Sequence, residues 1–284
     1  MPKTPKKSNS LVPATPSSKA LAGSKGTAST PKPIEGRNLG PLVGSKVAAG
    51  KLVGDEGTVS LEGGVTLVTG RAYATRDQVV PAEAIFFDRD AKPHADGPWL
   101  GEADKVCWRD EASGYDCIMM RERTDGHLRG FVGIPKDHPL WGWEDEAVPP
   151  DLGIEVHGGL DYAQECQNGP SPTLHAEMRR ICHVSETIRA RPLDAVGTPT
   201  NANAWWFGFS CDQPYDLVPN KRSQATSFMQ AEIGQQYRDD AYVVREIAHL
   251  AAQLRAIADG GEMPRRSGPT PPPIGLDPRR GGRA

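Results

Sequence analysis

The sequence lacks a long apolar run and is poor in aromatic residues. No stretch approaches the ~20 apolar residues that a membrane-spanning helix needs, and aromatic residues make up only 6% of the 284-residue chain. The first residues are basic but contain no continuous apolar segment of the kind found in secretory signals. We therefore expect a soluble, cytoplasmic protein that does not contact a membrane.

Strong catalytic and cofactor-binding motifs are also missing. The chain contains no phosphate-binding loop, no strand-linked GxGxxG, no HExxH, no CxxC and no GxSxG. Its five cysteines, an odd number in a chain without an export signal, favour reduced thiols or metal ligation over a disulfide framework. The sequence therefore discloses no reaction, and functional residues must be sought in less specific patterns.

Basic charge is concentrated at the two ends of the chain. Residues 1–37 hold seven Lys/Arg and one acidic residue, and residues 264–284 hold five Arg and one Asp. Because the whole chain carries −3, the part between these ends carries −13. Both ends are poor in large apolar residues, so we expect disordered basic tails over residues 1–37 and 262–284. Two roles stay open for them, a weak contact with nucleic acid and a solubilising function.

Two segments lie between the tails. Residues 38–96 predict an accessory β-rich segment with a small hairpin around Gly63-Gly64. This piece is too short to hold a core alone, so it either packs on the neighbouring domain or stays partly mobile. That domain, predicted over residues 97–261, is globular.

The globular domain contains one clear hairpin pattern and one clear helix pattern. Apolar residues alternate over Tyr115–Pro135, around a turn at Asp125-Gly126. Residues 238–261 carry apolar residues at spacings of three and four, which predicts a helix that begins at two aspartates and ends at two glycines. Short strands followed by one packing helix indicate an α+β fold, with a mostly antiparallel sheet and a C-terminal packing helix.

A histidine before two glycines, in "VHGGLDY", is the first candidate site. Backbone N–H groups at Gly158 and Gly159 can approach an anion, and His157 has the chemistry of an acid, a base or a ligand. Asp161 and Tyr162 follow as candidate ligand-binding residues. The alternative is that the glycines only permit a turn and His157 is a hydrogen-bonded strand residue.

The second candidate is the aromatic segment "WWFGFSCDQPYD", residues 205–216. In a strand, Trp206 points to the face opposite Trp205 and its alternate neighbours, so it is a candidate stacking wall for a ligand. Asp212 and Asp216 come directly after the strand, where they can accept hydrogen bonds or bind a cation. Two surface aspartates that cap a loop are the alternative.

Thiols and imidazoles in the same region raise the question of a metal. Zinc is bound by such groups, but the spacing between Cys166 and Cys182 is far from the short pairs typical of structural zinc sites. Zinc or another divalent metal is therefore not favoured, and small buried thiols are the simpler interpretation. The candidate ligands are Cys166, Cys182, His183 and Cys211.

A loop rich in Pro and Gly carries two tryptophans, Trp141 and Trp143, after His138-Pro139. Loops of this kind are lids over pockets or are held to the body by an aromatic anchor. The sequence leaves both interpretations open.

In order, these segments resemble an uncharacterised family found in bacteriophages, prophages and bacteria. The chain carries "HLRGFVGIPKDHPLWG", "VHGGLDY", "RICHVSE" and "WWFGFSCDQPYD", where the family carries "VHGGLT", "ICH" and "WWxGFDCAH" motifs in this order. The resemblance spans roughly residues 97–253 and implies no activity. It departs at Ser210 and Gln213, which stand where the family has Asp and His, and at Asp161, which stands where it has Thr.

The functional prediction is a phage-type accessory protein that binds a small polar ligand, a nucleotide or a sugar, near His157 and residues 205–216. Hydrolysis, weak or lost, would use His157 as general base with Asp212 beside it. The alternative is a non-catalytic interaction module that binds a host protein or nucleic acid.

Overall fold

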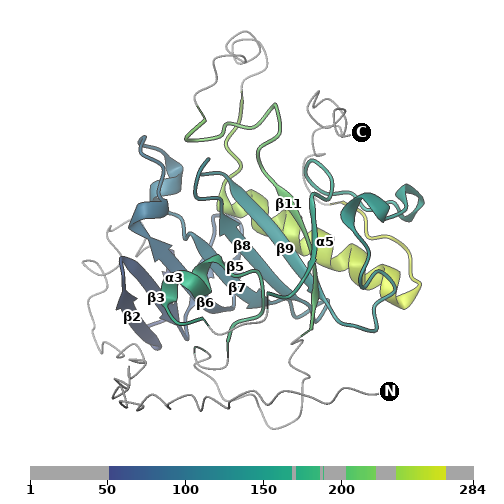
Figure 1. Cartoon of the computed structure of the whole chain (residues 1–284), viewed down its shortest axis with the longest axis horizontal. Coiled ribbons are helices and arrows are strands. Elements are labelled where there is room, and N and C mark those ends of the chain that lie inside the picture. Colours follow the sequence, from purple (N-terminus) through teal and green to yellow (C-terminus); the bar gives the residue numbers. More distant parts are fainter. Residues whose placement is uncertain (1–50, 168–170, 186–187, 189–202, 222–234, 267–284) are drawn as a thin grey trace, which may run out of the picture. The chain divides into compact units, whose positions relative to one another are not determined.

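An eight-stranded antiparallel sheet is the main element of the computed structural model (Figure 1). The structure describes residues 51–167, 171–185, 188, 203–221 and 235–266, all of which belong to one unit, residues 31–284. The predicted tails lie outside the described residues, apart from 262–266.

The order of the strands across the sheet is β10-β11-β9-β8-β7-β6-β3-β2, and every neighbouring pair is antiparallel. The strands are β2 (Thr58–Glu62), β3 (Val65–Thr69), β6 (Ala82–Asp88), β7 (Lys105–Arg109), β8 (Asp116–Arg121), β9 (Leu128–Ile134), β10 (Tyr162–Glu165) and β11 (Trp205–Ser210). A second, three-stranded sheet contains β1 (Leu52–Val53), β4 (Ala72–Ala74) and β5 (Val79–Val80).

Both predicted hairpins are confirmed. β2 pairs with β3 across Gly63-Gly64, whose φ angles of 57° and 86° suit a tight turn. β8 pairs with β9, and Gly126 between them has a φ of 80°. Since β6 pairs with β7, the segment 38–96 contributes strands to the same sheet as the globular domain that comes after it in the chain.

Helix α5 (Asp240–Asp259) is the predicted C-terminal helix. The Asp239 carboxylate accepts a hydrogen bond from the backbone N–H of Tyr242, and Gly260 ends the helix at a φ of 63°. A Cβ atom at Gly130 of β9 would lie 2.6 Å from Ile247, so the helix packs closely on the middle of the sheet. Among the helices of the described ranges, none is long and apolar enough to cross a lipid bilayer.

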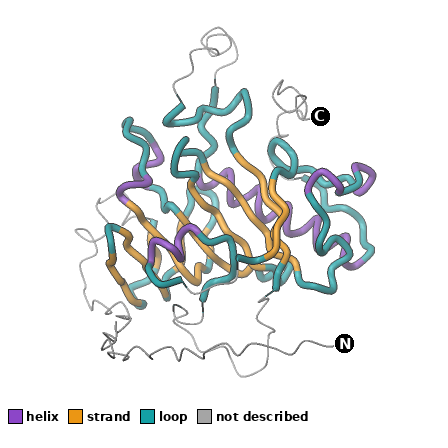
Figure 2. Tube along the Cα trace, viewed as in Figure 1, coloured by secondary structure: helices purple, strands orange, loops and turns teal. Residues whose placement is uncertain are grey.

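The sheet is covered on both faces, as Figure 2 shows. One face carries Val132, Phe207 and Phe209 and packs on α5. The other face carries Phe131 and Trp206 and packs on the segment 171–185, which includes the short helix α3 (Leu174–Arg179). Because neighbouring residues of a strand point to opposite faces, residues next to each other in β11 belong to two different environments.

The connections contain four short 3-10 helices. These are η1 (Arg89–Ala91), η2 (Pro98–Gly101), η3 (Asp145–Ala147) and η4 (Pro150–Leu152).

Candidate functional site

His157 lies in a tight turn on the α5 side of the sheet. The N–H of Gly159 donates to the carbonyl of Val156, and the φ angles of Gly158 and Gly159 are 67° and 84°. The imidazole is completely buried and packs against the rings of Phe209 and Tyr242. The two glycines therefore turn the chain and leave His157 pointing into the protein interior.

Both ring nitrogens of His157 are hydrogen-bonded. Nε2 lies 2.6 Å from Oδ2 of Asp216, and Nδ1 lies 2.8 Å from the hydroxyl of Tyr242. Because a carboxylate only accepts hydrogen bonds, Nε2 carries the proton. In the neutral imidazole, Nδ1 then accepts from the Tyr242 hydroxyl.

Asp216 and Tyr242 extend this arrangement into a buried network. Asp216 also accepts hydrogen bonds from the backbone N–H of Gln213 (3.0 Å) and from Nε of Arg238 (2.8 Å). The guanidinium of Arg238 lies 4.8 Å from the centre of the Tyr242 ring. Burial, followed by the charge of Glu246, raises the pKa of Tyr242 well above its usual value. His157 thus connects three segments of the chain from the inside.

The glycine backbone beside His157 faces a side chain of the protein itself. A Cβ atom built at Gly158 would lie 2.4 Å from the Gln213 amide. Gln213 is one of the positions at which the chain differs from the motifs of the family that it resembles.

Asp161 and Tyr162 lie toward the other face of the sheet. The Tyr162 ring packs edge-on against Phe131, with 5.2 Å between the ring centres. Nη2 of Arg129 is 3.9 Å from Oδ1 of Asp161, and Nε of Arg129 donates to the hydroxyl of Ser210 at 2.9 Å. Ser210, another position that differs from the motifs of the resembled family, is thus a hydrogen-bond partner of an arginine.

Asp212 does not bond to His157 and lies near a different histidine. Burial lowers the pKa of His127, and the negative charge of Asp212 partly offsets this effect. The two predicted catalytic residues therefore belong to two different groups of side chains.

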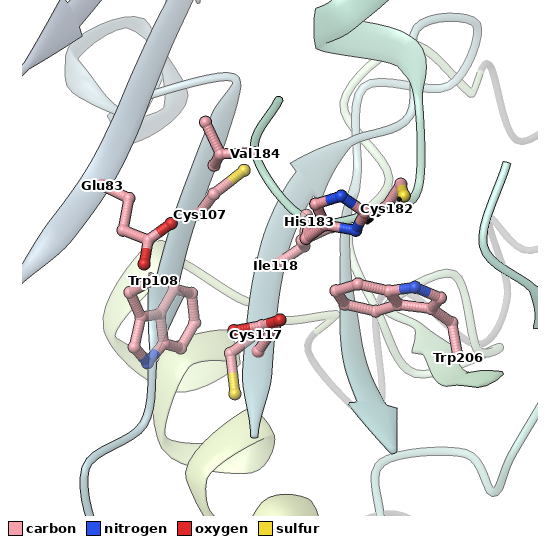
Figure 3. A pocket seen from close by; sticks show the side chains of 10 residues that line it. Glu83, Cys107, Trp108, Cys117, Ile118, Cys182, His183, Val184 and Trp206 are labelled. Atoms are coloured by element: carbon pink, nitrogen blue, oxygen red, sulfur yellow. Dashed lines mark hydrogen bonds between the residues drawn. The ribbon is translucent and has the colours of Figure 1, made fainter. Parts of the chain in front are cut away.

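Trp206 is fully buried on the α3 side of the sheet, where it lines a cavity with Asp116, Cys182 and His183 (Figure 3). We call this the Trp206 cavity, and its free volume is about 10 Å³, room for about one water molecule. Its remaining lining residues are Glu83, Cys107, Trp108, Cys117, Ile118 and Val184. Trp206 thus lies buried on the face of β11 opposite His157, and its role as a stacking wall for a ligand stays a prediction.

Two polar atoms of the Trp206 cavity have no hydrogen-bond partner among the described residues. They are Nε1 of Trp206 and Oδ2 of Asp116, and both are buried. The other carboxylate oxygen of Asp116 accepts from Nε of Arg109 at 3.0 Å. The cavity thus offers one N–H donor and one carboxylate acceptor.

The cysteines differ from the expected set of reduced thiols. Cys166 and Cys182 form a disulfide, with 4.8 Å between their Cα atoms, and Nδ1 of His183 lies beside both sulfurs. Cys211 is free and buried on the α5 side, where burial raises its thiol pKa well above the usual value. Three of the four candidate metal ligands therefore converge and Cys211 lies apart from them.

The tryptophan loop packs on the beginning of β11. The rings of Trp141 and Trp205 lie 5.8 Å apart, and Nε1 of Trp205 donates to the carbonyl of Trp143 at 2.9 Å. Lys136 extends over the Trp141 ring. The loop is thus fixed to the body by aromatic contacts at the end of β11 remote from Ser210.

Several residues of these sites are not evident from the sequence. Tyr242 and Glu246 lie beside the apolar stripe of the predicted helix. A polar side chain next to that stripe is the one feature of the sequence that indicates a buried hydrogen-bond partner. Asp116 is the first residue of β8, where a carboxylate in an alternating strand pattern suggests a solvent-exposed side chain. Arg238 lies one residue before the helix cap.

Comparisons with known proteins give no relative for the chain. No family model, no curated protein and no solved structure matches it.

Proposed function

We propose that the chain is a binding protein that takes up a small polar molecule in the Trp206 cavity. The observation that carries the proposal is the pair of buried groups without partners among the described residues, the indole N–H of Trp206 and Oδ2 of Asp116. Leaving a buried donor or acceptor without a partner costs about 1–3 kcal/mol. A ligand with one acceptor and one donor recovers this cost.

The chemistry of the lining favours a nucleobase or a monosaccharide. Both ligand classes carry donors and acceptors close together, as the indole N–H of Trp206 and Oδ2 of Asp116 require. The free volume of the cavity is about 10 Å³, room for about one water molecule, so a ligand of either class needs a movement of the lining side chains to enter. Burial raises the pKa of Cys107 to about 11, so this thiol is neutral at neutral pH and adds no charge to the lining.

The proposal does not include hydrolysis by His157. A general base needs a ring nitrogen within reach of the substrate, and both nitrogens of His157 are bonded to Tyr242 and Asp216 inside the protein. Binding without catalysis is therefore the function that the geometry supports best. The order of the sequence motifs supports the further proposal that the chain belongs to the phage and prophage family that it resembles.

Isothermal titration with a panel of nucleosides, nucleotides and monosaccharides tests the small-molecule proposal. We expect one of these classes to bind, and Trp206→Phe and Asp116→Asn each to weaken binding about tenfold, the loss of one hydrogen bond of about 1.4 kcal/mol. Trp205→Phe is the matched control, since Trp205 lies in the same strand and does not line the cavity. Absence of binding by the unaltered chain, or equal losses in Trp205→Phe and Trp206→Phe, would contradict the proposal.

A second function, an interaction module, is favoured by one observation. Trp143 is 40% exposed beside Trp141 and Trp205, and exposed aromatic residues are typical of the centres of protein interfaces. A partner protein retained by the full chain and lost on Trp143→Ala would support this function. Retention unchanged by that substitution would remove it.

A further inference from the structure

Three side chains with metal-binding chemistry converge beside the Trp206 cavity. Nδ1 of His183 lies 3.2 Å from Sγ of Cys182 and 3.5 Å from Sγ of Cys166. One ligand atom of each residue lies within 4.8 Å of the other two. This is the only such group among the residues that the structure describes.

Backbone contacts hold the two halves of this group together. The N–H of Cys166 donates to the carbonyl of Ala204, which ties it to the beginning of β11. Gln167 and Ile181 bond to each other twice, through a backbone N–H to carbonyl contact and through the Gln167 side chain. These hydrogen bonds therefore hold Cys182 and His183 next to Cys166. In common zinc motifs, a short spacing in the sequence brings the ligands together instead.

We propose that Cys166, Cys182 and His183 bind a zinc ion when the two cysteines are reduced. Tetrahedral zinc, with Zn–S of about 2.3 Å and Zn–N of about 2.0 Å, needs sulfur-to-nitrogen separations of about 3.5 Å. The two observed separations of 3.2 and 3.5 Å are close to this value. Two thiolates and one imidazole also select zinc over harder cations such as Mg²⁺.

The disulfide in the structure is the oxidised, metal-free form of the site. A dithiol reductant supplies two electrons and two protons, which break the S–S bond and give two thiols, while the reductant becomes a disulfide. Binding of Zn²⁺ then releases the thiol protons to solvent as each sulfur becomes a thiolate.

A zinc ion bound by these three residues would lie beside the Trp206 cavity. Cys182 and His183 line that cavity, and a zinc site with three protein ligands and one open position is typical of ions that bind water or a ligand. Asp116, whose Oδ2 is buried without a partner among the described residues, lines the same space. A water on the zinc would therefore have a carboxylate in the same cavity.

Metal titration of the full chain tests the site. The protein is reduced with a phosphine, which does not compete strongly for zinc, and is titrated with Zn²⁺ against a chromophoric chelator. Replacement by Co²⁺ reports thiolate ligands through a sulfur-to-metal charge-transfer absorption. We expect one ion per chain and a loss of affinity of more than about a hundredfold in Cys166→Ser, Cys182→Ser and His183→Asn, because loss of a direct ligand costs more than the ~10–100-fold caused by loss of an outer-shell partner.

Matched controls separate the site from general thiol and imidazole binding. Cys211→Ser removes a buried thiol from the other face of the sheet, and His175→Asn removes a histidine outside the group, so both should keep full affinity. The oxidised protein should bind no zinc. Binding by the oxidised protein, absence of the Co²⁺ charge-transfer band, or equal losses in Cys211→Ser and Cys182→Ser would overturn the proposal.

The zinc proposal does not depend on the small-molecule proposal. Trp206→Phe should weaken binding of the small ligand and leave zinc affinity unchanged, because the indole is not a metal ligand. Failure of zinc binding with intact ligand binding would reject only the metal site. The reverse result would reject only the small-molecule site.

Discussion

The Nε2 atom of His157 lies 2.6 Å from the carboxylate of Asp216, and neither side chain is exposed to solvent. His157 precedes β10, and Asp216 comes several residues after β11. The pair therefore joins two loops, and the bond from Nδ1 to Tyr242 adds α5 to them. A histidine of this kind contributes to stability through its position in the network rather than through exchange of protons with a substrate.

Replacement of His157 by Gln should destabilise the protein by about 3 kcal/mol, because it breaks a buried, hydrogen-bonded pair. Tyr242 loses a partner in the same change, and Asp216 keeps only Arg238 and the N–H of Gln213. Urea unfolding measures the difference. His94→Gln, at an exposed position, should change the free energy of unfolding by less than about 0.5 kcal/mol, and an equal effect of both substitutions would contradict the structural role.

Local sequence patterns predicted the elements of the fold better than they predicted the sites. The hairpin at Gly126 and the helix capped by Asp239 depend on neighbours in the chain, so their patterns are visible in the sequence. The faces of β11 were also predicted by alternation. The sequence did not show that residues 171–185 cover the opposite face. Because they do, Trp206, which was expected to form a wall for a ligand, is buried.

The candidate site depends on contacts between distant segments, which local patterns do not contain. His157 and Asp216 were both singled out from the sequence, and the structure brings them together. Their third partner, Tyr242, lies 85 residues from His157. Cys166 and Cys182 are brought together by the two hydrogen bonds between Gln167 and Ile181. The sequence spacing of the two cysteines does not show this proximity.

Substitution of Gly158 by Ala should cost more than the same substitution at Gly153. Both glycines have left-handed backbone conformations, with φ angles of 67° and 68°, so each substitution costs about 1–2 kcal/mol for the added Cβ. A Cβ at Gly158 would also lie 2.4 Å from the Gln213 side chain, whereas nothing lies within 4 Å at Gly153. We expect an additional loss of about 1–3 kcal/mol at Gly158, as for other overpacked sites, measured by urea unfolding.

A second substitution isolates the steric part of this loss. Gln213→Ala in the Gly158→Ala background should recover the additional loss and leave the backbone cost, because it removes the amide that the Cβ meets. In the Gly153→Ala background it should give no recovery. Equal costs at the two glycines would show that Gln213 moves away freely.

The stability of the protein should fall as the pH drops below about 6.5. Burial lowers the pKa of His138, whose Nδ1 accepts a hydrogen bond from the N–H of Leu140 while Nε2 lies 2.8 Å from the carbonyl of Leu254. The folded protein thus keeps this histidine neutral, whereas the unfolded chain protonates it near its ordinary pKa of about 6.5. Since the unfolded state then binds more protons, the free energy of unfolding decreases as pH falls through that value toward the lower folded pKa.

Urea unfolding at about pH 7, 6 and 5 measures this slope, to which one histidine contributes at most about 1.4 kcal/mol per pH unit. His138→Gln should make the slope shallower, although it also lowers stability at neutral pH. His94→Gln, at an exposed position, should leave the slope unchanged. Identical slopes in the unaltered chain and His138→Gln would contradict the assignment.

Replacement of Arg121, even by lysine, should lower the free energy of unfolding. Its side chain is fully buried, and its guanidinium bonds to Glu102 at 2.8 Å, to Asp104 at 2.9 Å and to the hydroxyl of Tyr237 at 3.0 Å. A lysine retains the charge but cannot reach three separate partners with one ammonium group, so two buried carboxylates lose bonds. We expect Arg121→Lys to lower the free energy of unfolding by about 3 kcal/mol, against less than about 0.5 kcal/mol for Arg76→Lys, whose side chain is 64% exposed. Tyr237 directly precedes Arg238, which bonds to Asp216. Hydrogen exchange at residues 235–240 should therefore also accelerate in Arg121→Lys. Unchanged exchange there would show that the buried network of Arg121 and that of Asp216 are independent.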